Sequence, residues 1–118
     1  MWYPPDGYPW AFSRLYCNSD LFEDLDWIFA EIINQDIVDS IKSCGGSYNV
    51  RPIRGSSSGR WSLHSFGIAI DFNAETNALG TVGDMNPTLV SIFKYSGWAW
   101  GGEFSRSDPM HFQRAHGC

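Results

Sequence analysis

The order of helical and extended patterns along the chain predicts an α+β fold, with a small, mostly antiparallel sheet and flanking helices. Three observations support this class. An apolar stripe at helical spacing follows residue 20, an apolar run covers residues 68–73, and a short helical pattern at residues 87–95 precedes two short extended segments. Because 118 residues suffice for one hydrophobic core, we expect a single domain over residues 1–118.

The first long helix is expected to start at residues 18–20, where Asp20 followed by Glu23 resembles a capping box. Its apolar stripe comprises Leu21, Leu25, Ile28 and Ile32. The pattern continues to Ile41 after a break near Asn34, and the sequence Cys44-Gly45-Gly46 should end it. Before the helix, residues 1–19 form an irregular arm rich in proline and aromatic residues, packed on the domain. Its aromatic side chains either cover the domain or form a sugar-stacking platform.

Shorter elements fill the rest of the chain. We expect a strand at residues 48–53, a flexible serine-rich loop at 55–59 and a strand at 68–73. The last of these is apolar on both faces and should therefore be central in the sheet. A loop over residues 74–86 leads to a helix that begins at Pro87 and ends before Gly97. Two strands follow, at residues 98–100 and 110–112.

Composition excludes several classes of function. A net charge of −5 argues against a nucleic-acid-binding protein, which needs a basic surface. No apolar run is long enough for a membrane span, and the first residues lack the pattern of a signal peptide, so we expect synthesis in the cytoplasm. The three cysteines (Cys17, Cys44 and Cys118) show no disulfide spacing and are expected to be thiols, with one disulfide as the alternative. We expect a monomer.

One carboxylate lies in an unusual position. Asp71 stands between Ile70 and Phe72 in the apolar run, where burial of its charge is costly unless it is paired or ligates a metal. His64 lies seven residues earlier, and a bend at Gly67 would let the two side chains converge. Together with His111, they supply two imidazoles and one carboxylate, which is the ligand set of a catalytic zinc ion with one open position.

Further charged residues fit a hydrolytic reaction at such a site. Asp108 precedes His111 by three residues, and Pro109 could hold its carboxylate at a fixed distance as a general base and then a proton donor. Arg51 and Arg54 could bind a substrate carboxylate or stabilise an oxyanion. Plainer roles also fit the spacing: His64 as a surface residue, His111 as a core histidine and Asp108 as the start of a turn.

Two motifs resemble a known family. Residues 62–71 (SLHSFGIAID) resemble the S-x-H-x-x-G-x-A-x-D signature of the zinc D-Ala-D-Ala carboxypeptidase and L-Ala-D-Glu peptidase family, which includes phage endolysins and vancomycin-resistance peptidases. The sequence Trp100-Gly101-Gly102 and the run DPMHF at residues 108–112 resemble its second motif. The resemblance covers residues 47–114 and implies a Hedgehog/DD-peptidase-like zinc peptidase fold. The family position that is commonly glutamate is Gln113 here, which puts a supporting contact at that position in question.

The resemblance implies roles for individual residues. One zinc ion would be held by His64, Asp71 and His111, with Asp108 as the catalytic acid and base. Arg51 is the first choice for the arginine that contacts substrate, and Arg54 the second. The expected substrate-binding residues are Ser62, Phe66 and Trp100, and these aromatic residues together with Trp98 either wall the cleft or belong to the core.

The function implied is hydrolysis of peptidoglycan stem peptides at the cell wall. L-alanyl-D-glutamate endopeptidase activity of the phage endolysin type is the first expectation, because a small domain without a signal peptide or anchor suits that role. A D-Ala-D-Ala carboxypeptidase and a non-catalytic wall-binding module on the same fold are the alternatives. A structural metal domain fits less well, since structural zinc takes four protein ligands.

Overall fold

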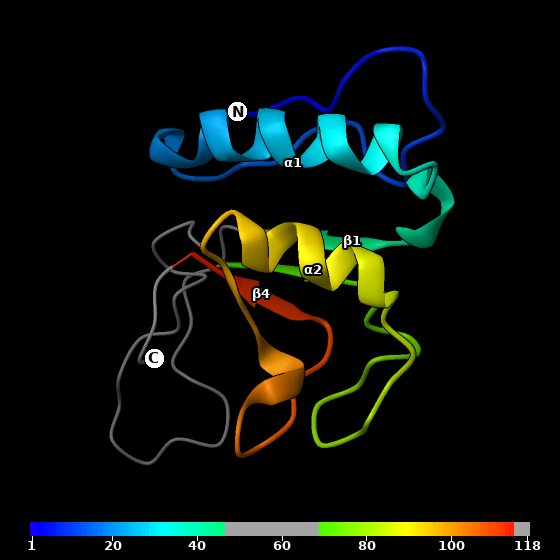
Figure 1. Ribbon diagram of the computed structural model, residues 1–118, viewed down its shortest axis with the longest axis vertical. Coiled ribbons are helices and arrows are strands. Elements are labelled where there is room, and N and C mark those ends of the chain that lie inside the picture. The colour runs from blue at the N-terminus through cyan, green and yellow to red at the C-terminus, as the bar shows by residue number, and fades with distance from the viewer. Residues whose placement is uncertain (47–68, 115–118) are drawn as a thin grey trace.

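The computed structural model describes residues 1–46 and 69–114 and shows an α+β domain (Figure 1). Its helices are α1 (Phe22–Asn34) and α2 (Pro87–Tyr95). Its strands are β1 (Cys44–Gly46), β2 (Ala69–Phe72), β3 (Ala99–Trp100) and β4 (His111–Gln113). The strands form one antiparallel sheet in the order β1-β2-β4-β3, so the predicted fold class is confirmed and β2 is a central strand as expected.

Helix α1 departs from the expected start and end. The Asp20–Glu23 capping box is not formed; instead the Asn18 side chain accepts a hydrogen bond from the backbone N–H of Asp20 (2.9 Å) and begins a 3-10 turn at Ser19–Leu21. The break expected near Asn34 is confirmed, because α1 ends at that residue. The helical continuation to Ile41 is wrong: Asp36 adopts a left-handed conformation (φ 57°), and only a second 3-10 turn follows, at Val38–Ser40. An apolar pattern alone therefore overestimates the helical content after the break.

The residues expected only to end that helix form strand β1 instead. Cys44–Gly46 pairs with β2, with Cys44 opposite Phe72, although glycine is disfavoured in strands. Asn73 directs the approach of this segment: its side-chain oxygen accepts hydrogen bonds from the backbone N–H groups of Lys42 (2.7 Å) and Ser43 (3.1 Å). The strand expected at residues 48–53 lies outside the described residues.

Helix α2 matches the prediction at both ends. The Asn86 side chain caps it by accepting hydrogen bonds from the N–H groups of Thr88 (2.8 Å) and Leu89 (3.3 Å), and Pro87 occupies the first turn. The chain leaves the helix through Gly97, which has a left-handed conformation (φ 91°). Local signals thus define this helix completely.

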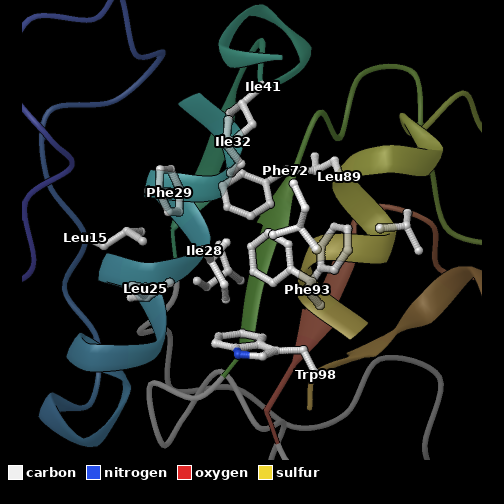
Figure 2. Close-up of a cluster of buried hydrophobic side chains, with 14 of the residues drawn as sticks. Leu15, Leu25, Ile28, Phe29, Ile32, Ile41, Phe72, Leu89, Phe93 and Trp98 are labelled. Carbon is white, nitrogen blue, oxygen red and sulfur yellow. The ribbon is translucent and has the colours of Figure 1, made fainter. Parts of the chain in front are cut away.

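Both helices cover the same face of the sheet. Figure 2 shows side chains of α1 and α2 meeting Phe72 of β2 in one hydrophobic core. The ring of Phe93 lies 4.6 Å from Phe112 and 5.8 Å from Phe72, measured between centroids. The core thereby fixes β2 and β4 side by side, with their alternate side chains directed to the opposite face.

The N-terminal arm adds to this core. Trp2 and Leu15 are buried and form a backbone bridge, and the Trp2 indole donates a hydrogen bond to the Asp26 carboxylate (2.8 Å). Cys17 forms no disulfide with any described residue, and burial raises the pKa of its thiol. None of the helices in the described segments is long and apolar enough to cross a membrane.

Candidate metal and catalytic site

The site is built on the face of the sheet that the helices leave uncovered. Along β2, Ile70 and Phe72 are buried in the core, so the intervening Asp71 projects to the opposite face. Antiparallel pairing places Asp71 directly opposite His111 of β4, while Ile70 is opposite Phe112. Two residues that are 40 positions apart in the sequence are therefore brought together by strand register.

The two side chains are in direct contact. The Asp71 Oδ1 atom lies 3.2 Å from His111 Nδ1, and the side chains are 15% and 8% exposed respectively. On the other edge of the ring, His111 Nε2 lies 2.8 Å from Gln113 Oε1. Because an amide oxygen only accepts hydrogen bonds, this contact favours the tautomer with the proton on Nε2. The Nδ1 lone pair then faces a carboxylate oxygen, and these two acceptors repel unless a cation, either a proton or a metal ion, lies at them.

This arrangement fits two ligands of one zinc ion. With zinc–nitrogen and zinc–oxygen bonds of about 2.0–2.2 Å and tetrahedral geometry, two donor atoms lie about 3.4 Å apart. The Asp71–His111 separation of 3.2 Å is close to that value. Within residues 1–46 and 69–114, no group of three or more His, Cys, Asp and Glu side chains gathers as a metal site. The third ligand expected, His64, lies outside the described residues.

Gln113 contacts the His111 ring, although it stands at a position where the family commonly has glutamate. It lies two residues beyond His111 on the same strand, hence on the same face, and is only 1% exposed. Strand pairing sets it between Ala69 of β2 and Ala99 of β3. The small neighbouring side chains leave room for its amide to reach the imidazole. The even spacing of residues 111 and 113 is the signal that could have predicted this contact.

The turn that carries Asp108 is joined to the Trp-Gly-Gly sequence. The backbone N–H of Asp108 donates to the carbonyl of Gly101 (2.8 Å), and the N–H of His111 donates to the carbonyl of Asp108 (3.0 Å). The indole of Trp100 donates to the carbonyl of Pro109 (2.8 Å). The two parts of the second motif therefore form one unit, which ends at the start of β4.

The remaining predicted site residues have different placements. Arg51, Arg54, Ser62 and Phe66 lie outside the described residues, as does the bend expected at Gly67. Trp98 is 2% exposed and packs edge-on against Phe93 (5.2 Å between ring centroids), so it belongs to the core. Trp100 is half-buried against the core and contacts the Asp108 turn, and its contact with a substrate stays a prediction.

An α+β domain with a paired carboxylate and imidazole on the sheet face opposite the helices is consistent with a peptidase. A family described as D-alanyl-D-alanine carboxypeptidase matches residues 55–114, which is just over half of the chain, and the protein belongs to this family. The matched residues include Asp71, Asp108 and His111 as well as His64, whereas Arg51 and Arg54 precede them. Comparisons with curated proteins and with solved structures gave no match.

Proposed function

We propose that this protein is a zinc-dependent peptidase that hydrolyses peptidoglycan stem peptides, and that the bond it cleaves is the one between L-Ala and D-Glu. The observation that carries the proposal is the contact of Asp71 with His111 in a chain of the D-alanyl-D-alanine carboxypeptidase family. Members of this family are generally zinc-dependent. The residues that would hold the ion are Asp71, His111 and His64.

A zinc ion bound at these residues would supply Lewis-acid chemistry, polarising the scissile carbonyl and activating water for attack. Asp71 contributes the negative charge that a divalent cation requires. Gln113 keeps the proton of His111 on Nε2, so that the lone pair of Nδ1 remains available to bind the metal ion. The described residues would therefore hold two metal-binding atoms, one from Asp71 and one from His111, in place before the metal ion binds.

Asp108 is the proposed acid and base. Its carboxylate would take a proton from the attacking water and then give that proton to the departing amine. The hydrogen bonds to Gly101 and His111 fix the backbone of Asp108 on both sides, which favours such a role because proton transfer depends on short, defined distances. An arginine, with Arg51 preferred to Arg54, would stabilise the oxyanion.

The substrate class is a peptidoglycan peptide, and we propose that the protein acts at the bacterial cell wall in the manner of a phage endolysin. Ser62, Phe66 and Trp100 are the proposed substrate contacts. The endopeptidase is placed first because the small size of the domain suits an endolysin. A D-Ala-D-Ala carboxypeptidase is the second candidate, and the description of the matching family favours it.

Digestion of a defined stem peptide, L-Ala-D-Glu-diamino acid-D-Ala-D-Ala, separates these candidates. Mass spectrometry should detect free L-Ala and a tetrapeptide with a new N-terminal D-Glu. Release of the terminal D-Ala alone would make the protein a carboxypeptidase. A zinc-loaded sample that cleaves neither bond would contradict both and favour a non-catalytic wall-binding module.

A further inference from the structure

We propose that the loop over residues 77–84 is a positioning element for Asp108, acting through Gly83 and the neighbouring Pro109. This loop belongs to neither motif and contains no residue expected to touch substrate. The inference rests on the proposed function, since it concerns the placement of the carboxylate that would transfer the proton.

A buried asparagine holds the loop in one conformation. Asn77 is fully buried, and its amide nitrogen donates to the carbonyl of Asn73 (3.0 Å) and to the Asp84 carboxylate (2.9 Å). Its amide oxygen accepts from the backbone N–H of Asp84 (3.0 Å). The hydroxyl of Thr76 also donates to the Asp84 carboxylate (2.7 Å), and this hydrogen bond lowers the pKa of Asp84. These bonds close a segment that has no helix or strand to define its shape.

The loop contacts the residues on both sides of Asp108. The N–H of Gly80 donates to the carbonyl of Ser107 (2.6 Å), and the Ser107 hydroxyl donates to the carbonyl of Thr81 (2.8 Å). Gly83 packs against Pro109: a β-carbon at Gly83 would lie 2.9 Å from Pro109 Cγ and 3.0 Å from Pro109 Cβ. The residue before Asp108 is therefore hydrogen-bonded to the loop, and the residue after it is in van der Waals contact with the loop.

The opposite side of the turn is fixed by Gly101. A β-carbon there would collide with the Asp108 carbonyl oxygen and lie 3.0 Å from His111 Cβ. The turn at Asp108 and Pro109 is thus held between two close glycine contacts, one from Gly101 to Asp108 and one from Gly83 to Pro109. A displacement of about 1 Å at a catalytic group can lower a rate by about 10²-fold, so the contact at Gly83 should matter for turnover.

The chain offers a matched pair of variants for a test. Gly83 and Gly7 both have left-handed backbone conformations (φ 73° and 90°), so replacement by alanine imposes similar backbone strain at each. A β-carbon at Gly7, in the N-terminal arm, meets no atom within 4 Å, whereas one at Gly83 meets Pro109 and the Asn77 side-chain oxygen. Only Gly83→Ala therefore pushes on the Asp108 turn.

The experiment measures kcat, KM, zinc content and thermal unfolding for the full chain acting on the stem peptide. Gly83→Ala should lower kcat by about 10²-fold with zinc content and KM unchanged, while Gly7→Ala keeps the wild-type kcat. In an Asp108→Ala background, Gly83→Ala should lower the residual rate no further, because the group that it displaces is gone. A wild-type kcat in Gly83→Ala overturns the proposal. So does a further loss of about 10²-fold when Gly83→Ala is added to Asp108→Ala.

Two further outcomes are distinguishable. If Gly83→Ala does not fold, Ser107→Ala tests the same link, because it removes only the hydrogen bond to Thr81; a lowered kcat at unchanged zinc content supports the proposal, and a wild-type kcat overturns it. If Asp108→Ala alone has the wild-type rate, the acid and base role in the proposed function is wrong. A wild-type kcat for Gly83→Ala beside an inactive Asp108→Ala overturns only the role of the loop.

Discussion

Replacing Gln113 by leucine should weaken zinc binding without changing the fold. Gln113 accepts the Nε2 proton of His111 at 2.8 Å and is 1% exposed, so water cannot take its place. Leucine has a similar volume but no acceptor. The imidazole then loses the bond that fixes its proton on Nε2, and the proton can occupy Nδ1, the atom that faces Asp71.

The expected size follows from the buried hydrogen bond. Leaving a buried donor without its acceptor costs about 1–3 kcal/mol, which corresponds to roughly 5- to 150-fold in an equilibrium constant. Loss of partners that orient metal ligands typically weakens metal affinity by about 10- to 100-fold. The two ranges agree, and we expect Gln113→Leu to bind zinc about 10- to 100-fold less tightly than the wild type.

The assay is competition of the metal-free protein with a chromophoric chelator for zinc, together with nitrogen NMR of His111 to identify its tautomer. Gln113→Glu is the matched control, because it keeps the acceptor and has nearly the same shape. It should retain zinc affinity and the Nε2 proton. Unchanged affinity and an unchanged tautomer in Gln113→Leu would refute the assigned role of Gln113.

Three further predictions concern the site, the core and the loop. His111→Ala should lose zinc and activity together, whereas Asp108→Ala should keep zinc and lose turnover by about 10²–10⁴-fold, measured by metal analysis and peptide hydrolysis. Phe93→Ala removes a fully buried ring from the core and should lower the free energy of unfolding by about 3–5 kcal/mol in urea titration. Asp84 has a lowered pKa in the folded protein, so its contribution to stability is present at neutral pH and is lost as the pH falls through that pKa. The stability difference between wild type and Asp84→Asn should therefore shrink below about pH 4, and a difference that grows there would contradict the hydrogen bonds assigned to Asp84.

Elements with local signals could be predicted from the sequence. Helix α2 has a side-chain cap at Asn86, a proline in its first turn and a glycine after its end, and all three act within a few residues. Strand β2 was predicted because its own sequence has apolar residues on both faces. Strand β1 was missed because two distant interactions determine its conformation: its pairing with β2, and the hydrogen bonds that Lys42 and Ser43 donate to Asn73, some 30 residues away.

The same distinction applies to the site. Asp71 and His111 could be grouped as metal ligands from their residue types and from the family motifs. The strand register that sets them opposite each other could not be predicted, because it joins segments 40 residues apart. The contact of Gln113 with His111 follows from strand alternation but needed the structure to show that its amide reaches the ring. The contacts of the loop at residues 77–84 with Ser107 and Pro109 could not be predicted. They depend on a backbone hydrogen bond and on the close packing of a glycine, and neither leaves a recognisable pattern in the sequence.

The central claim is that this chain is a metal-dependent peptidoglycan peptidase, and the most direct test is digestion of purified peptidoglycan with and without a chelator. The account predicts a cut between L-Ala and D-Glu, its loss on chelation, and its return on addition of zinc. The Asp108→Ala variant should not make this cut even when it is loaded with zinc. An undiminished cut in the chelated protein, or no cut by the wild type holding one zinc ion, would contradict the account.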